Sequence, residues 1–256
     1  MWASAAPREI EPLIAAVVEV FEAFEEKPAR MFVTASKVKQ TAYHAARFAT
    51  AVRGEETLRV TVKGAGDARV LVSLHLRDDP EYAKYVDHRH VELIAPTTAP
   101  DDSRLIRFLT AACATYPVAH GGIMRAATVY HAGAEARVIG SSEVEDATDR
   151  RIGFDAMNAP RALDKLRRLY PVTIIGPDIW AKLPPIPDVE PRPKVEDLGN
   201  CKMLTCWPEL VDVHDLQFLL GTRELRRWLW PFTIQNPADD PDEVDHRLRW
   251  AELLPW

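Results

Sequence analysis

The sequence predicts an α+β protein, built mainly of antiparallel sheet with helices packed on it. Two observations lead to this prediction. Strand-like segments follow one another as hairpins, and helical segments stand between them without a regular strand–helix–strand repeat. The chain has 256 residues, of which 47% are apolar and 27% are charged. This is the ordinary balance of a globular protein with a proper core.

The first predicted helix covers residues 10–24. Its apolar side chains recur three and four positions apart while glutamates occupy the other faces, which is the pattern of an amphipathic helix. The short apolar run Met31-Phe32-Val33 predicts a strand or a connection. Small alanine side chains recur across residues 38–52, and they predict a second helix that packs closely on its neighbour.

The clearest β signal lies between residues 58 and 76. Apolar and polar side chains alternate over residues 58–62, a glycine-rich turn follows at 64–67, and alternation resumes over residues 70–76. Two such segments around a turn predict an antiparallel hairpin with one buried face. A third strand is expected at residues 91–94, before Pro96.

The next helix is expected after Asp101-Asp102-Ser103, which can cap its first turn. Its buried side would hold Leu105, Leu109, Ala112 and Tyr116. The remaining predicted elements are strand material over 122–139, a helix from Pro160, a buried strand at 172–175, a short strand at 202–207, and a helix from Asp215 to Trp228 that Pro231 stops.

The domain prediction is a single α+β domain over residues 1–256. Five prolines at 184–193 predict a stiff, exposed connection, and residues 213–256 are expected to form a C-terminal helical appendage. No internal repeat of the length used by solenoid proteins is visible.

Composition excludes several classes of protein. No run of about 18 apolar residues exists, so no membrane span is expected. The first residues lack the basic start and apolar centre of a secretory signal. Three cysteines in unremarkable positions do not make a disulfide framework. We therefore expect a cytoplasmic protein with reduced thiols and no membrane partner.

Net charge is unevenly distributed along the chain. Residues 1–128 hold 16 acidic and 16 basic side chains, whereas residues 129–256 hold 22 acidic and 16 basic ones. A nucleic-acid partner would need a basic face, so the excess negative charge argues against one. It fits a surface that attracts a cationic protein, although simple solubility also explains it.

The usual signatures of catalysis are absent from the sequence. There is no phosphate-binding glycine loop, nucleophile elbow or zinc-binding helix motif, so we expect no enzyme and no cofactor. His88 and His90 would project to one side of an extended segment, but exposed loop histidines explain the pair better than a metal site does. Cys201 and Cys206 are spaced too loosely for a zinc knuckle, and we expect buried structural cysteines. No metal is predicted.

The most informative segment is near the C-terminus. Residues 223–231 join arginine and tryptophan at a helix end, and the following loop holds five carboxylates within residues 239–245. Tryptophan and arginine are enriched where proteins bind one another, and carboxylates suit a basic partner. A second acidic patch lies in a predicted loop at 143–149. The candidate interface residues are Asp239, Asp240, Asp242, Glu243 and Asp245, with Glu143, Glu145, Asp146 and Asp149 as the second patch.

The same segment permits a different interpretation, in which the arginines bind a small anion. Guanidinium groups suit phosphate and carboxylate ligands, and an aromatic ring could stack nearby. The residues concerned are Arg223, Arg226, Arg227 and Trp230. The alternative is an internal role, in which the arginines favour the helix C-terminus and pair with Asp239, Asp240 or Asp242.

The last hundred residues, roughly, resemble a family of bacterial proteins. The segment 169–180, the strand before Trp207-Pro208, and Asn236-Pro237-Ala238-Asp239 after the arginine–tryptophan helix are similar to bacterial immunity proteins. Such proteins protect cells against their own polymorphic or type VI secreted toxins, and the likeness is to the immunity protein 52 group and related type VI families. The resemblance implies a cytoplasmic α+β protein that binds and blocks one toxin without turnover or cofactor.

These observations leave three hypotheses of function. The first is an immunity-type protein that blocks a cognate, basic toxin by occlusion. The second is an enzyme or small-anion binder that uses the three arginines. The third is a structural or adaptor protein of a secretion or phage system. The oligomeric state is open in all three.

Overall fold

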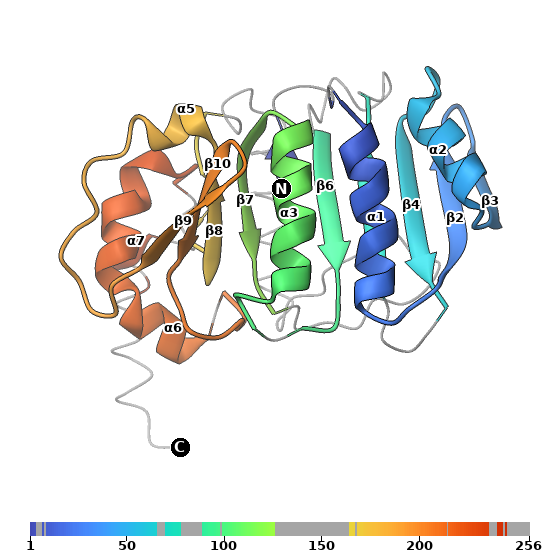
Figure 1. The fold of residues 1–256 in the computed structure, drawn as a ribbon. Coiled ribbons are helices and arrows are strands. Elements are labelled where there is room, and N and C mark those ends of the chain that lie inside the picture. The colour runs from blue at the N-terminus through green and yellow to red at the C-terminus, as the bar shows by residue number, and fades with distance from the viewer. Residues whose placement is uncertain are drawn as a thin grey trace.

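A computed structural model describes residues 1–3, 7, 9–65, 70–77, 89–97, 99–125, 164–166, 168–213, 215–235, 240–242 and 244. Its strands form one continuous sheet in the order β3-β2-β4-β5-β6-β1-β7-β8-β10-β9 (Figure 1). Every described pair of neighbouring strands is antiparallel. The strands are β1 (Trp2–Ala3), β2 (Pro28–Thr34), β3 (Val38–Ala42), β4 (Arg59–Gly64), β5 (Leu71–His75), β6 (Arg89–Ile94), β7 (Val118–Ile123), β8 (Val172–Ile175), β9 (Lys194–Leu198) and β10 (Cys201–Thr205).

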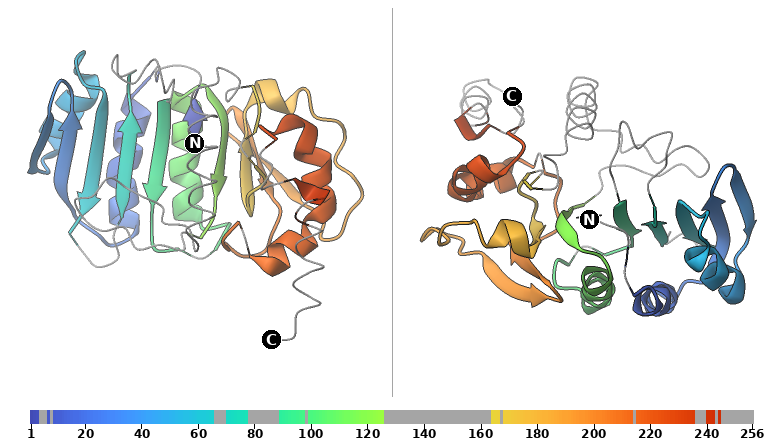
Figure 2. Two further views of the ribbon diagram at one scale, coloured as in Figure 1. Left: turned by 180° about the vertical axis from the view of Figure 1, so that it is seen from behind. Right: turned by 90° about the horizontal axis from the view of Figure 1, so that it is seen from above.

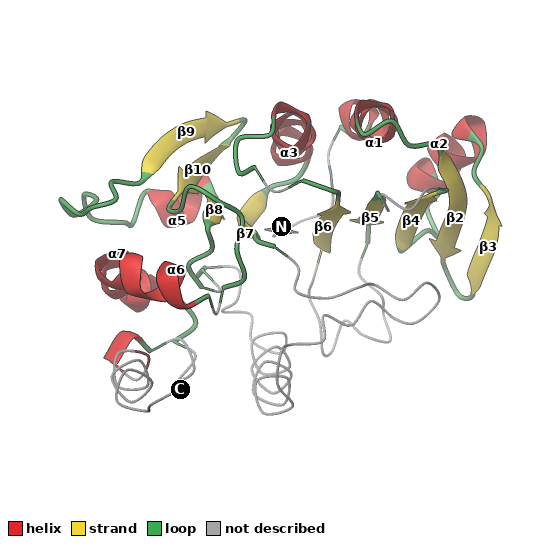
Figure 3. Ribbon diagram, turned by 90° about the horizontal axis from the view of Figure 1, so that it is seen from below, coloured by secondary structure: helices red, strands yellow, loops and turns green. Residues whose placement is uncertain are grey.

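Helices cover parts of both faces of this sheet. On one face lie α1 (Glu11–Ala23), α2 (Ala45–Arg53) and α3 (Ser103–Thr115), as Figure 2 shows from above. On the opposite face, at the end of the sheet that holds β8 and β10, lie α6 (Leu216–Gly221) and α7 (Arg223–Leu229) (Figure 3). The short helix α5 (Pro177–Trp180) follows β8, and the 3-10 turn η2 (Trp230–Phe232) follows α7. The predicted antiparallel α+β class is confirmed.

The larger core lies between α1, α3 and the sheet. Leu13, Val17 and Phe21 are buried on α1, so the predicted amphipathic helix is confirmed. The predicted hairpin is also correct, because β4 and β5 pair with Val62 opposite Val72 and both side chains buried. Burial of these apolar faces is the main favourable contribution to folding here.

A smaller core lies between the sheet and the C-terminal helices. It contains Ile175 of β8, Leu204 of β10, and Leu225 and Leu229 of α7, all almost completely buried. The proline-rich residues 184–193 form the connection from α5 to β9, and partly buried apolar side chains of this connection pack against the smaller core.

Three predicted helices differ from the structure. Residues 38–42 are strand β3, because they pair with β2, and the helix begins only at Ala45 after the extended His44. Leu166 makes an isolated β-bridge with Thr233, so residues 164–166 and 168–170 are not helical. The single helix expected over 215–228 is broken at Thr222 into α6 and α7. The predictions for residues 126–163 lie outside the described residues.

The two edge strands of the sheet carry charged side chains. On β3, Lys39 is exposed beside Val38, whose exposed fraction is 63%. On β9, Lys194 and Asp197 are exposed, and Lys194 pairs with Glu196 at 2.9 Å.

Each helix of the described residues is too short or too polar to cross a membrane. All three cysteines are buried and free of disulfide bonds. Cys201 belongs to the larger core and Cys206 to the smaller one, so the two thiols serve opposite faces of the sheet, as strand alternation predicts.

Candidate interaction surface

The first part of the predicted binding segment, residues 223–231, lies in α7 and the start of η2, directly after α6. Asp215 caps α6 by accepting a hydrogen bond from the backbone N–H of Phe218 at 3.0 Å. The buried hydroxyl of Thr222 donates to the carbonyl of Phe218 at 2.6 Å, and the chain leaves α6 at this residue. The same carbonyl also accepts the backbone N–H of Thr222 at 3.0 Å, and the backbone of Thr222, with φ −106° and ψ 14°, then departs from helical geometry, so the predicted single helix is divided at this residue.

Close packing on Trp207 fixes the end of α6. A Cβ atom added to Gly221 would come within 2.4 Å of Cζ3 of Trp207, so only glycine allows this approach. The Trp207 ring also meets Phe218 edge-on, with ring centroids 6.0 Å apart. The two short helices are therefore held to the smaller core by specific contacts.

The three arginines of α7 occupy different environments. Arg226 is 8% exposed, and its Nη2 donates to the carbonyl of Leu219 at 2.6 Å, so it links α7 to α6. Arg227 is exposed and pairs with Glu224 at 3.0 Å. Arg223 is half-buried. Because Arg226 lies inside the protein, the structure does not present all three guanidinium groups together on the surface.

Arg227 also reaches the acidic segment that follows. Its Nη2 lies 3.4 Å from Oδ1 of Asp242, which matches the predicted internal pairing. The side chain of Asp242 is 87% exposed and that of Arg227 is 42% exposed. Exposed ion pairs of this kind contribute at most about 1 kcal/mol of stability, so a partner could displace this one easily. The high exposure of the Asp242 side chain leaves it accessible to such a partner.

The acidic segment begins with a local cap. Oδ1 of Asp240 accepts a hydrogen bond from the backbone N–H of Asp242 at 2.9 Å. The backbone carbonyl of Asp240 accepts a second one from the backbone N–H of Val244 at 2.9 Å. Val244 is buried and anchors this turn to the protein. The other candidates in the segment, and the whole second patch, lie outside the described residues: Asp239, Glu243, Asp245, Glu143, Glu145, Asp146 and Asp149.

Trp230 lies half-buried at the start of η2. Its carbonyl accepts a hydrogen bond from the hydroxyl of Thr233 at 2.9 Å. Leu166 then holds the following segment by two backbone hydrogen bonds, accepting from Ile234 at 2.9 Å and donating to Phe232 at 2.8 Å. A tryptophan with part of its ring exposed on a braced segment can serve as an anchor for a partner.

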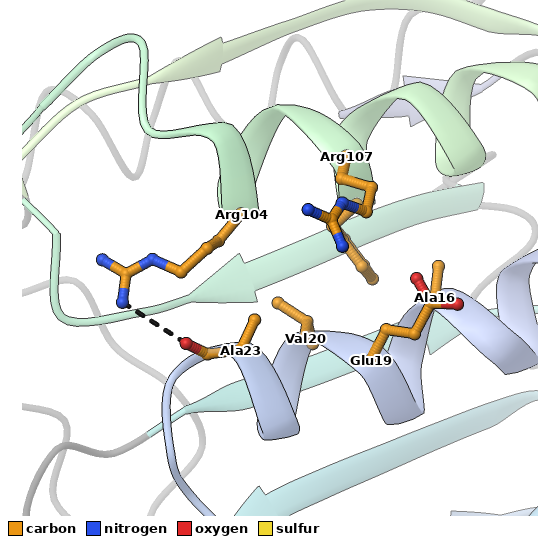
Figure 4. A pocket seen from close by; sticks show the side chains of 7 residues that line it. Ala16, Glu19, Val20, Ala23, Arg104 and Arg107 are labelled. Carbon is orange, nitrogen blue, oxygen red and sulfur yellow. Dashed lines mark hydrogen bonds between the residues drawn. The ribbon is translucent and has the colours of Figure 1, made fainter.

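Sequence reasoning missed a second charged region, between α1 and α3. Arg104 of α3 extends across to α1, where its guanidinium lies 4.1 Å from the ring centroid of Phe24 and donates to the carbonyl of Ala23 at 3.4 Å (Figure 4). The shallow cavity beside it, also lined by Glu19 and Arg107, has a volume of about 10 Å³, which is room for about one water molecule. Only the cap at Asp102 was visible in the sequence.

The metal candidates gain no support from the described part of the chain. No group of three or more histidine, cysteine or acidic side chains that could hold a metal ion occurs there. His88 and the side chain of His90 are outside the described residues.

Comparison with known proteins adds a likeness in fold. The fold defines an α+β protein organised around one large antiparallel sheet. No protein-family model and no curated protein matches the chain. Among solved structures, the chain is similar to the Pseudomonas aeruginosa T6SS protein PA0821, with a TM-score of 0.54 and 12% identity over 98% of this chain and 83% of that one. At this identity the likeness shows the fold alone.

Proposed function

We propose that this chain is a type VI secretion immunity protein that binds one cognate toxin and blocks it by occlusion. The observation that carries the proposal is the fold likeness to a T6SS protein over 98% of the chain. The resemblance of the last hundred residues, roughly, to type VI immunity proteins supports the same conclusion from sequence. In this proposal the protein acts in the cytoplasm, converts no substrate and needs no cofactor.

The surface proposed for the toxin is the end of α7 together with the turn that follows η2. Asp240 and Asp242 supply negative charge, and Trp230 supplies an aromatic anchor. Exposed carboxylates would speed the encounter with a basic toxin, because opposite charges steer association. A partly exposed ring that becomes buried on binding would slow release, since aromatic anchors contribute most of the energy of typical interfaces.

The smaller core gives this surface its rigidity. Leu225 and Leu229 fix α7 against the sheet, and Val244 fixes the acidic turn. A partner that binds a preformed surface loses less conformational entropy than one that must order it first. This arrangement supports tight binding.

The experiment is co-expression with the protein encoded by a neighbouring gene, which this proposal expects to be the toxin. We expect the two proteins to co-purify and the chain to restore growth of cells that make the toxin. Toxicity that persists at full expression of this chain, together with failure to co-purify, would contradict the proposal.

A further inference from the structure

Strands β2 and β4 display basic side chains on the face of the sheet opposite to α1, α2 and α3. Met31 of β2 and Val62 of β4 are buried in the larger core, so the residues that alternate with them project to the opposite face. They include three cations, an aromatic ring and a hydroxyl, which we call the basic face: Arg30, Arg59, Lys63, Phe32 and Thr61. The basic face lies on the same side of the sheet as α6 and α7, but at the other end (Figure 3).

Two of the cations are neighbours across the strands. Arg30 and Lys63 are direct partners in the register of β2 and β4. The Cβ atoms of such partners are about 5 Å apart, and like charges at this distance destabilise a sheet. Within the part of the chain that the structure describes, neither side chain has an ion pair or a hydrogen bond, and the same is true of Arg59. Natural proteins keep unfavourable arrangements of this kind mainly where a function requires them.

The cations of the basic face are accessible. Arg30 and Arg59 are exposed, and Lys63 is half-buried. Arg59 and Lys63 are four residues apart on β4, which separates their Cα atoms by about 13 Å. An extended polyanion that lies along β4 would therefore meet both of them, with Arg30 beside Lys63.

The aromatic ring lies between these charges. Phe32 is half-buried and belongs to neither core of the described residues, whereas the next residue, Val33, packs against the larger core. Its neighbours in the sheet are Gln40 on β3 and Thr61 on β4, whose hydroxyl is hydrogen-bonded to that of Ser73 at 2.9 Å. A partly exposed ring among cations and uncharged polar groups suits a single nucleic-acid strand, because a base stacks on the ring while the cations attract phosphates.

We propose that the basic face binds single-stranded RNA. A base stacks on Phe32, and Arg30, Arg59 and Lys63 contact the phosphates on either side. Gln40 and Thr61 beside the ring favour RNA over DNA, because only ribose offers them a 2′-hydroxyl. In a duplex the bases are stacked on one another, so the ring would contribute nothing.

This proposal replaces the expectation of no nucleic-acid partner, which rested on net charge alone. Phosphate binding depends on the local field, and the residues of β2, β3, β4 and β5 that project to this face are all basic or uncharged. The inference does not depend on the proposed function, because the surface proposed for the toxin lies at the other end of the sheet.

The test titrates a labelled oligouridylate of about 12 nucleotides with the full chain and measures fluorescence anisotropy. We expect a dissociation constant on the order of 10 µM at low salt. Three phosphate contacts on a single strand predict that each doubling of the salt concentration weakens binding about fourfold. No binding at protein concentrations up to about 100 µM would overturn the proposal.

Charge variants separate the basic face from net charge. Arg30→Glu should weaken RNA binding at least about tenfold, yet keep or raise the melting temperature, because the new carboxylate is the direct partner of Lys63. Arg47→Glu makes the same change in net charge on the exposed surface of α2, on the other face of the sheet, and should change binding less than about twofold. Equal losses in the two variants would overturn the proposal.

Aromatic variants separate RNA from an acidic protein surface, the other candidate ligand. Phe32→Leu should weaken RNA binding at least about fivefold, whereas Phe32→Trp should retain it, because base stacking needs an aromatic ring. Melting temperatures of both variants show whether the fold is kept. Binding that Phe32→Leu leaves unchanged, or an oligothymidylate of the same length that binds as tightly as the RNA, would overturn the assignment to RNA.

Discussion

The carboxylate of Asp102 is held by the side chain of Arg104, which donates to it through Nε at 3.0 Å and Nη2 at 2.8 Å. The same carboxylate accepts from the backbone N–H of Arg104 at 2.9 Å and from the hydroxyl of Thr97 at 2.6 Å. These bonds, those of the Arg104 side chain above all, hold the pKa of Asp102 well below its usual range despite partial burial. Ionisation of the Asp102 carboxyl therefore adds to the stability of the folded protein.

The first prediction concerns pH. An acid with a depressed folded-state pKa contributes fully above its unfolded pKa of about 3.9, and the contribution is lost as pH falls through the folded value. Asp102→Asn keeps a capping side chain but loses the charge, so it should lower the free energy of unfolding by about 1–2 kcal/mol at pH 7. Urea unfolding should show this difference shrink below about pH 4. Asp101→Asn, at an exposed neighbour, is the control and should change little at either pH.

The second prediction tests the smaller core. Leu229 is fully buried, so Leu229→Ala should cost about 2–5 kcal/mol of unfolding free energy. Leu216, on the adjacent helix, is 44% exposed, and Leu216→Ala should cost less than about 0.5 kcal/mol. Chemical denaturation of both variants measures the difference. Equal effects would mean that α7 is not anchored as described.

The third prediction separates two arginines of one helix. Arg226→Ala removes a buried donor to the Leu219 carbonyl and should lower stability by about 1–3 kcal/mol. Arg227→Ala removes two exposed ion pairs and should cost less than about 1 kcal/mol. If both variants kept wild-type melting temperatures but lost binding of inorganic phosphate, the anion-binding hypothesis would replace the internal role of Arg226.

The fourth prediction concerns the proposed toxin surface. Asp242→Lys reverses an exposed charge beside Arg227 and should weaken toxin binding by about tenfold, mainly through a slower association rate that depends on salt. Glu22→Lys makes the same change on α1, on the other face of the sheet, and should leave binding intact. Surface plasmon resonance at two salt concentrations measures both. Equal losses would mean that net charge, and not this surface, governs binding.

Local sequence patterns predicted the elements that their own residues determine. The hairpin β4–β5 was visible because alternation and a glycine turn lie within twenty residues or so of each other. Helix α3 was visible because Asp102 caps a periodic apolar face. By contrast, Val38–Ala42 is rich in helix-compatible residues, and only pairing with β2 makes it a strand.

Long-range relationships could not be predicted in this way. The two-residue strand β1 lies between β6 and β7, and no local signal marks so short a strand or its partners. The burial of Arg226 likewise depends on how α6 and α7 meet at Thr222, because exposure on a short helix is decided by its neighbours. Sequence alone identified the arginine–tryptophan segment but not which of its side chains face the solvent.

The charged borders of the sheet have a consequence for behaviour in a crowded cell. The edge strands of an open sheet have unpaired backbone N–H and C=O groups, with which a strand of another chain can pair, and repeated pairing of this kind leads to aggregation. Pairing of a further strand with β3 or β9 would remove water from charged side chains, namely Lys39 on β3 and Lys194 and Asp197 on β9. The cost of this desolvation opposes edge-to-edge association of copies. The immunity protein proposed above, if protected in this way, could be made in excess over its toxin without adding to itself.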